Sequence, residues 1–263
     1  MQEKKTFKIV STKKSRYILP NLLTIVGVCL GISSIKFSLD GNFSLAILFI
    51  LFAALLDGLD GRIARLLDST SEFGKELDSL TDFVSFGIAP ALTLYFWELK
   101  NLGNLGWVIT LIFSVCCVLR LARFNLTKIS DQEKWRVNFF EGVPSPAGAW
   151  LVLLPLIYEL SSFDTGLEFR KVTPFLTVLI SVLLVSKIPT LSFKKIAIPR
   201  SLSIFLLLGV GIIFVSLVYY TFETLFIIGT IYFFVIPLSF FIFKNKMEKF
   251  KKLSQEDDPD DIL

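Results

Sequence analysis

The sequence predicts an all-α polytopic membrane protein with about eight transmembrane helices and both termini in the cytoplasm. Hydrophobic residues make up 53% of the 263 residues and the mean hydropathy is +0.67, a composition outside the ordinary range of soluble domains. Apolar runs recur at about the 20 residues that a helix needs to cross a bilayer, and basic residues favour one of the two sides that these runs define. We therefore expect membrane lipids around the protein, and no nucleic-acid partner.

Each apolar run is interpreted as one membrane helix because its length is close to the hydrophobic thickness of a bilayer. The last two runs are separated only by Thr221 to Glu223, but together they are too long for a single span. We expect one membrane domain over residues 19–243, between a basic cytoplasmic segment at 1–18 and a charged cytoplasmic tail at 244–263. The eight predicted helices lie near residues 20–36, 43–65, 75–97, 104–124, 144–161, 172–188, 202–220 and 223–243.

The two ends of the chain carry different kinds of polar sequence. Residues 1–18 hold six basic residues against Glu3 alone, and the apolar stretch that follows lacks a small-residue cleavage site, which predicts a retained first helix. For Phe7–Ile18, a basic helix on the membrane surface and a flexible tail are equal alternatives. The acidic run Glu256–Asp261 is typical of a solvated, disordered tail.

The distribution of lysine and arginine predicts the orientation of the chain. If the N-terminus is cytoplasmic, 23 of the 27 basic residues fall on the cytoplasmic side, as the positive-inside rule requires. This split favours an even number of spans, and we expect the protein in the inner membrane of the cell. The four basic residues expected on the opposite side are Lys36, Lys100, Arg170 and Lys171.

Four aspartates interrupt this apolar sequence in the second and third predicted helices. On a helix, Asp57 and Asp60 are separated by one turn, as are Asp78 and Asp82, so each pair shares one face. Four charged aspartates near a bilayer centre would together cost on the order of 10 kcal/mol without compensation. A set of oxygen ligands in a chain with no histidine therefore indicates a hard divalent cation, Mg²⁺ or Mn²⁺.

The predicted topology places all four carboxylates at a similar depth. Asp57 and Asp60 lie roughly 22–27 Å from Asn42 along the second helix, near the cytoplasmic end of a core about 30 Å thick. Asp78 and Asp82 lie roughly 5–10 Å in from the same side. A nucleotide could reach this depth from the cytoplasm while a lipid tail stayed in the bilayer, so we expect an active site that faces the cytoplasm.

The spacing of these residues resembles the signature of the CDP-alcohol phosphotransferase family, D-x2-D-G-x2-A-R-x8-G-x3-D-x3-D. A charged turn between two membrane helices is the simpler alternative, but it gives no reason for acids one turn apart within the helices themselves. The eight fixed positions are all present as Asp57, Asp60, Gly61, Ala64, Arg65, Gly74, Asp78 and Asp82.

Further stretches, within roughly residues 18–150, are similar to the bacterial membrane-integral phosphatidylserine synthases of that family. The resemblance implies that CDP-diacylglycerol donates a phosphatidyl group to L-serine, with phosphatidylserine and CMP as products. The stretches are Pro20-Asn21-Leu-Leu-Thr24, Asp78-Ser-Leu-Thr-Asp82-Phe-Val-Ser85-Phe86-Gly87-Ile-Ala-Pro90, Arg120-Leu-Ala-Arg123-Phe-Asn125 and Gly142-Val-Pro-Ser-Pro146.

The resemblance also implies roles for individual residues. Asp57 and Asp78 would bridge two ions, either Mg²⁺ or Mn²⁺. Asp60 would complete one metal site, and Asp82 would complete the other and act as the base for the serine hydroxyl. The residues expected to bind CDP are Asn21, Thr24, Asp60, Gly61, Ala64, Arg65 and Gly74. Those expected to bind the acceptor or the lipid phosphate are Ser85, Arg120, Arg123 and Asn125.

Several alternatives stay open from the sequence. The glycines are also typical of close helix packing in membranes, and interfacial arginines are often topology signals or snorkelling side chains. The acceptor could be choline, glycerol 3-phosphate or inositol phosphate, and the chain could instead be an ion-coupled transporter or a non-catalytic scaffold. We also expect a homodimer, without a disulfide among Cys29, Cys116 and Cys117.

Overall fold

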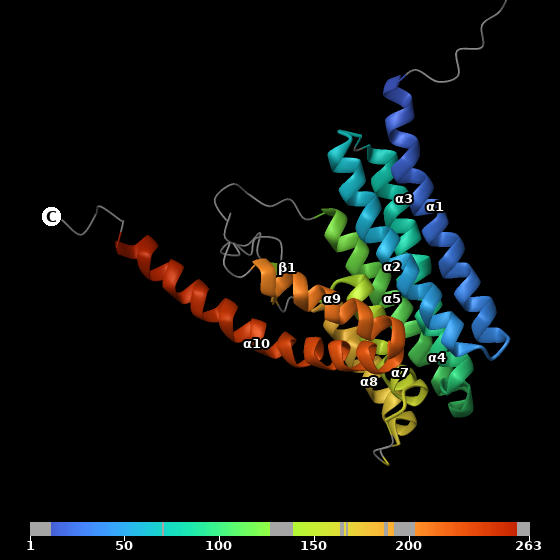
Figure 1. The fold of residues 1–263 in the computed structure, drawn as a ribbon. Coiled ribbons are helices and arrows are strands. Elements are labelled where there is room, and N and C mark those ends of the chain that lie inside the picture. Colours follow the sequence, from blue (N-terminus) through green and yellow to red (C-terminus); the bar gives the residue numbers. More distant parts are fainter. Residues whose placement is uncertain are drawn as a thin grey trace, which may run out of the picture. The chain divides into compact units, whose positions relative to one another are not determined.

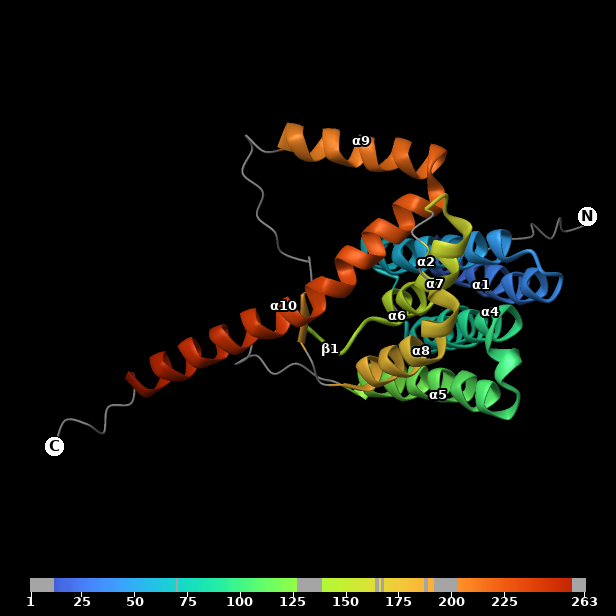
Figure 2. The same cartoon turned by 90° about the horizontal axis from the view of Figure 1, so that it is seen from below.

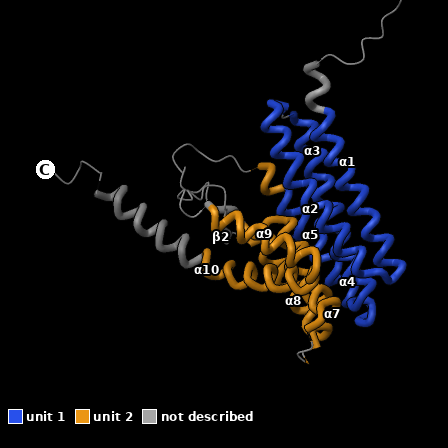
Figure 3. The backbone as a smooth tube through the Cα atoms, in the orientation of Figure 1, with its two compact units in different colours: residues 1–121 blue, residues 122–263 orange. Residues whose placement is uncertain are grey.

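The computed structural model describes a largely helical chain with one short pair of strands (Figure 1). The chain forms two compact units, residues 1–121 and residues 122–263 (Figure 3). The predicted single membrane domain with boundaries at 18/19 and 243/244 stays a prediction. The residues that the structure describes are 12–69, 71–126, 139–163, 166, 168–186, 189–191 and 203–256.

The first unit consists of helices joined by short turns. Gly41 takes a φ of +76° in the first turn, a conformation that glycine adopts without steric cost, and Asn42 caps the helix that follows by accepting from the Leu45 amide at 3.3 Å. Its elements are α1 (Thr12–Leu39), α2 (Phe43–Leu66), α3 (Glu72–Asp82), the π-helix η1 (Phe83–Ile88), α4 (Ala89–Trp97), the 3₁₀-helix η2 (Leu99–Leu102) and α5 (Asn104–Leu126), whose last turn enters the second unit.

Helix α1 lies against most of the first unit, in contact with α2, α3, η1 and α4 (Figures 1 and 2). Small residues permit this close approach. The Ser85 hydroxyl of η1 donates to the Gly27 carbonyl of α1 at 3.3 Å, and the hydroxyls of Ser38 and Thr93 lie 2.8 Å apart. Since lipid is as apolar as a leucine side chain, such packing and interhelical hydrogen bonds are what hold membrane helices together.

Gly31 of α1 allows one of these close contacts. An added Cβ would lie 2.9 Å from the Cα of Ser85, so the backbone would have to move. We expect Gly31→Ala to lower the stability of the protein by about 1–3 kcal/mol, as overpacking usually does, measured as thermal unfolding in detergent. Gly58→Ala is the matched control, since its Cβ would meet nothing within 4 Å. Equal melting temperatures for Gly31→Ala and Gly58→Ala would contradict the close contact.

Five helical stretches of the described residues are long and apolar enough to cross a membrane. Large apolar side chains on them point outward, such as Leu55 and Leu105, which are 60% and 70% exposed. This exposure fits a protein whose surroundings are lipid. A sixth apolar helix, Ile204–Tyr219, is shorter. The candidate spans are Ile18–Leu39, Phe43–Leu66, Glu72–Trp97, Asn104–Leu126 and Thr221–Ser239.

The second unit adds two elements that the all-α prediction did not contain. These are the strands β1 (Phe139–Glu141) and β2 (Pro189–Leu191), which pair antiparallel with Phe140 opposite Thr190. The helices of the unit, besides the end of α5, are α6 (Ser145–Val152), α7 (Leu154–Leu160), α8 (Phe169–Val185), α9 (Ser203–Tyr219) and α10 (Thr221–Glu256).

The fifth predicted helix is divided into α6 and α7 at Leu153. Pro155 explains the break, because it has no amide hydrogen to donate to the carbonyl four residues earlier. Around the break, Leu151, Leu156 and Ile157 are buried in the core of the second unit. The ring of Tyr158 extends this core, since it lies 4.2 Å from the Phe169 ring.

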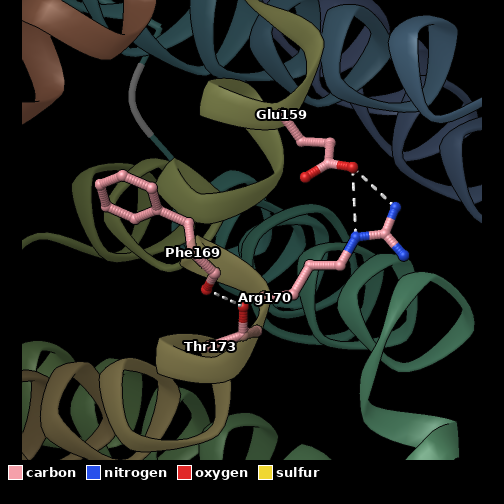
Figure 4. A network of polar contacts seen from close by, with 4 residues as sticks. All are labelled: Glu159, Phe169, Arg170 and Thr173. Carbon is pink, nitrogen blue, oxygen red and sulfur yellow. Dashed lines mark hydrogen bonds and ion pairs between the residues drawn. The ribbon is translucent and has the colours of Figure 1, made fainter. Parts of the chain in front are cut away.

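A polar network joins the end of α7 to the start of α8 (Figure 4). Arg170 donates to Oε1 of Glu159 through both Nε and Nη2, at 3.2 and 2.7 Å, and Thr173 donates to the Phe169 carbonyl at 3.1 Å. Lys171 pairs with Glu168 nearby. Exposed ion pairs contribute at most about 1 kcal/mol, so this network orients the connection more than it stabilises the fold.

Two helices extend beyond their predicted ends. Helix α10 continues to Glu256, although the predicted span ended at residue 243, because residues 244–256 are rich in strong helix formers and contain no glycine or proline. Helix α1 likewise begins at Thr12, so the end of the basic segment is helical. Residues 1–11 and most of the acidic run at 256–261 lie outside the described residues.

Candidate functional site

Helices α2 and α3 bring three of the four aspartates together. Ligand oxygens of Asp57, Asp60 and Asp78 all lie within 4.8 Å of one another. The chain reverses between the two helices through a turn in which Asp68 has a φ of +48°, and Ser71 caps α3 by accepting from the amide of Gly74 at 3.0 Å. Because α1 packs against both helices, it supports the cluster from a third side.

Asp82, the fourth aspartate, belongs to the same cluster. It ends α3 one turn after Asp78, and its carboxylate neighbours that of Asp57. Its Oδ1 is buried without a hydrogen-bond partner. A buried acceptor left unsatisfied typically costs about 1–3 kcal/mol, and more when it is charged. This oxygen therefore lacks a hydrogen-bonding partner, which a ligand would supply.

The residues present fit a divalent cation. Their donors are carboxylate oxygens, which Mg²⁺ and Mn²⁺ prefer, and they are held close together on helices. A cation would offset the mutual repulsion of Asp57, Asp60 and Asp78 and would complement the unpartnered Oδ1 of Asp82. The structure thus supports a metal centre at the predicted residues, whereas the identity and number of the ions stay predictions.

The burial of Asp60 differs from that of its neighbours. Its side chain is only 4% exposed, whereas Asp57 and Asp78 are half-buried. Its Oδ2 accepts a hydrogen bond of 2.6 Å from Thr24 of α1. The sequence placed Thr24 among the residues that bind CDP, and the structure shows its hydroxyl on a carboxylate of the cluster.

Two of the residues predicted to bind CDP are glycines, and the space around them differs. A Cβ at Gly61 would meet nothing within 4 Å, so helix packing does not account for this glycine. A Cβ at Gly74 would lie 3.1 Å from Ser71 Oγ and 3.4 Å from Asn21 Oδ1, so packing suffices there. Arg65 is exposed and donates from Nε to the Gly61 carbonyl at 2.9 Å. Open space at Gly61 favours the close approach of a ligand to this face of α2, on which Ala64 also lies.

A π-helix begins directly after Asp82, a feature that sequence reasoning missed. Such segments occur frequently at functional sites, because they change which side chains share a face. Ser85 lies within it and was predicted to contact the acceptor or the lipid phosphate. Its buried hydroxyl donates to the Gly27 carbonyl of α1, and its role toward the substrate stays a prediction. Gly87 in the π-helix permits close packing on α5, since a Cβ there would lie 3.2 Å from the sulfur of Cys117.

The basic residues near the end of α5 have different surroundings. Arg120 is 8% exposed and interacts electrostatically with Asp82, so the structure brings it to the carboxylate cluster. Arg123, in the second unit, donates from Nη1 to the carbonyl of Val185 at 2.6 Å. Asn125 is exposed. The burial of Arg120 and its electrostatic interaction with Asp82 are compatible with a role at the site, and the roles of all three residues stay predictions.

The Gly142-Val143 stretch packs against the C-terminal end of α8. Gly142 has a φ of +75°, and a Cβ there would lie 2.8 Å from the carbonyl oxygen of Leu184. The amide of Val143 donates to the Leu183 carbonyl at 3.5 Å. Together with the guanidinium of Arg123, these groups satisfy carbonyls that a helix end leaves without partners. This role explains the glycine without invoking a substrate.

Comparison with known proteins identifies the family. The sequence model described as CDP-alcohol phosphatidyltransferase matches residues 17–186. A Mycobacterium leprae protein named CDP-diacylglycerol–serine O-phosphatidyltransferase is 42% identical over 186 residues, which cover 69% of this chain and 61% of the relative. Proteins of the same name from Helicobacter pylori and Bacillus subtilis are 38% and 36% identical, and the matches cover 76% and 67% of this chain and 82% and 92% of the relatives.

The matched region contains the whole carboxylate cluster. The match to the Mycobacterium leprae relative spans 61% of that protein's length, and the match to the Mycobacterium tuberculosis relative spans 64%. The family match covers more than half of this chain and includes Asp57, Asp60, Asp78 and Asp82. The resemblance inferred from the eight signature positions is confirmed: the chain belongs to the CDP-alcohol phosphatidyltransferase family.

Proposed function

We propose that the protein transfers the phosphatidyl group of CDP-diacylglycerol to the hydroxyl of L-serine, releasing phosphatidylserine and CMP. The observation that carries this proposal is the cluster of Asp57, Asp60 and Asp78 with the unpartnered oxygen of Asp82, set in apolar helices. It supports metal-assisted phosphoryl chemistry on a lipid-linked substrate. The names of the relatives, CDP-diacylglycerol–serine O-phosphatidyltransferase, favour serine among the possible acceptors.

In the proposed reaction, the serine hydroxyl oxygen attacks the phosphorus that carries diacylglycerol. The bond from that phosphorus to the CMP oxygen breaks, and CMP leaves with the bonding electron pair. Divalent ions bound at the cluster would supply the charge that stabilises the pyrophosphate and the departing CMP. Asp57, Asp60 and Asp78 would hold these ions. Asp82, which we also assign to the metal site, takes the proton of the serine hydroxyl.

The protein's other groups would position the substrates. The open face at Gly61, with Ala64 and Arg65, is suited to the close approach of a nucleotide, and Asn21 and Gly74 lie together at the start of α3. Arginine is well suited to pair with phosphate. Arg120 would balance the charge near Asp82 and offer a cation to the serine carboxylate or the lipid phosphate.

The cellular setting is part of the same proposal. We infer eight membrane crossings in the inner membrane, with both termini and the active site on the cytoplasmic side, and a homodimeric assembly. The excess of basic residues on the predicted cytoplasmic side supports this orientation. The helix pair α6 and α7, helix α8 and helix α9 would provide the three crossings beyond the five candidate spans.

Cysteine labelling tests the orientation. Single cysteines placed in residues 97–104 or 162–171 of a variant without the native cysteines should react with an impermeant reagent added outside the cell. Cysteines in residues 126–140, most of which lie outside the described residues, should react only after the cytoplasmic side is exposed. The opposite pattern would show that the charge distribution does not set the orientation of this chain.

The test of the proposed function is a lipid-product assay with the purified protein. CDP-diacylglycerol is offered with serine, choline, glycerol 3-phosphate or inositol phosphate, in Mg²⁺ or Mn²⁺. We expect phosphatidylserine and CMP only with serine, no product in EDTA, and recovery when either metal is restored. Full activity in chelator would contradict the metal centre, and a product with another alcohol would reassign the acceptor. Metal-dependent CMP release would exclude a transporter or a scaffold.

A further inference from the structure

The hydroxyl of Thr24 contacts the carboxylate cluster, although its helix, α1, contributes none of the four aspartates. Thr24 donates to Oδ2 of Asp60 at 2.6 Å, and the two residues are only 6% and 4% exposed. We propose that Thr24 is a positioning residue, which holds the Asp60 carboxylate in the orientation that binds a divalent cation. The inference rests on the metal centre of the proposed function, but not on the identity of the acceptor alcohol.

The hydroxyl of Thr24 is itself confined. Its Oγ1 lies 3.1 Å from the carbonyl oxygen of Pro20, one turn earlier on α1. A threonine in a helix has few allowed χ1 rotamers, and contact with the carbonyl four residues earlier selects one of them. The distance of 2.6 Å to Asp60 is typical of a hydroxyl that donates to a charged carboxylate, which is stronger than a neutral hydrogen bond. The donor is therefore fixed and its preferred acceptor is Asp60.

A fixed Oδ2 orients the whole carboxylate. The terminal torsion of an aspartate is otherwise broad, so without Thr24 the carboxylate of Asp60 could rotate about its Cβ–Cγ bond. Metal binding needs ligand oxygens in defined places, and groups hydrogen-bonded to the ligands maintain them. Since α1 packs against both α2 and α3, Thr24 ties Asp60 to the helix that contacts both helices of the cluster.

This assignment differs from a direct contact with the nucleotide. The single hydroxyl hydrogen of Thr24 is shared between Asp60 and the Pro20 carbonyl, so it is not available to a phosphate oxygen. Thr24 would then influence CDP-diacylglycerol through the metal that Asp60 binds. Its effect should appear first in metal affinity, measured without any substrate.

The test is Mn²⁺ binding to the purified full-length protein, with free Mn²⁺ followed by electron paramagnetic resonance. Thr24→Val keeps the shape of the side chain but removes the donor, and we expect its Kd for Mn²⁺ to rise about 10–100-fold. Thr24→Ser keeps the hydroxyl and should restore most of the affinity. Thr110→Val is the matched control, because Thr110 is also buried and donates to the carbonyl of Gly106 at 2.9 Å on α5. Its Kd should equal that of the wild type.

Three outcomes would overturn the inference. Wild-type Mn²⁺ affinity in Thr24→Val, with weaker binding of CDP-diacylglycerol, would make Thr24 a nucleotide contact. An equal loss in Thr24→Ser and Thr24→Val would make its role one of packing. A wild-type protein that binds no Mn²⁺ would remove the metal centre and this inference together. A protein that binds Mn²⁺ as expected but does not use serine would contradict only the acceptor assignment.

Discussion

Asparagine in place of Asp78 or Asp57 is expected to reduce CMP release to background and to abolish the metal-dependent binding of CDP-diacylglycerol. Both aspartates have ligand oxygens within 4.8 Å of the other members of the triad, and we propose that both contact two ions. Asparagine keeps the size of the side chain but removes its charge and one carboxylate oxygen. The cation would then be held too weakly to bind the pyrophosphate.

The measurement pairs two assays on each variant. CMP release is followed with serine, and donor binding is followed without serine, each in Mn²⁺ and in EDTA. Asp40→Asn is the charge-matched control, since Asp40 is exposed in the turn after α1 and pairs with Lys36 at 2.5 Å. We expect Asp40→Asn to behave as the wild type. If Asp78→Asn kept metal-dependent donor binding, the assignment of Asp78 as a shared ligand would be wrong.

Asp82→Asn is expected to lose a larger share of turnover than of donor affinity. Asp82 would support one ion and would also take the proton of the serine hydroxyl, so its loss removes a base as well as a ligand. Removing a general base typically lowers the rate by about 10²–10⁴-fold, and a weakened metal site would add to this loss. The base role follows from the family resemblance, and the structure places Asp82 within the carboxylate cluster, where a proton acceptor is needed.

The two assays separate these roles at Asp82. We expect kcat to fall by at least about 10²-fold, while CDP-diacylglycerol binding in Mn²⁺ weakens much less than it does in Asp78→Asn. Turnover above about a tenth of the wild-type value would show that Asp82 is not the base, since that loss is below the range for a lost base. Asp60 would then become the next candidate, and its contact with Thr24 would have to be reinterpreted.

The sequence predicted the helical segments well because their signal is local. A run of apolar residues of the right length indicates a helix regardless of what surrounds it, and all eight predicted ranges contain helix. The predicted helix boundaries were less accurate where a segment is polar but still favours a helix. At residues 244–256 the sequence becomes charged but keeps strong helix formers, so α10 continues to Glu256.

The metal ligands were also predictable, because their spacing is local. Asp57 and Asp60 share a face of α2 through helical periodicity alone, and so do Asp78 and Asp82 on α3. That the two pairs meet follows from a short connection between two membrane helices. The structure confirms that Asp57, Asp60 and Asp78 lie together, while the roles of single aspartates stay predictions.

Contacts between helices were decided only by the tertiary structure. The sequence could not assign Thr24 to Asp60, Ser85 to Gly27, or Arg123 to the end of α8. In a soluble helix, one apolar face shows which side is buried, but a membrane helix is apolar on nearly every face. Its rotation about its own axis is set by packing against its neighbours. Periodicity therefore determined which residues share a face, and the packing of the helices determined what that face contacts.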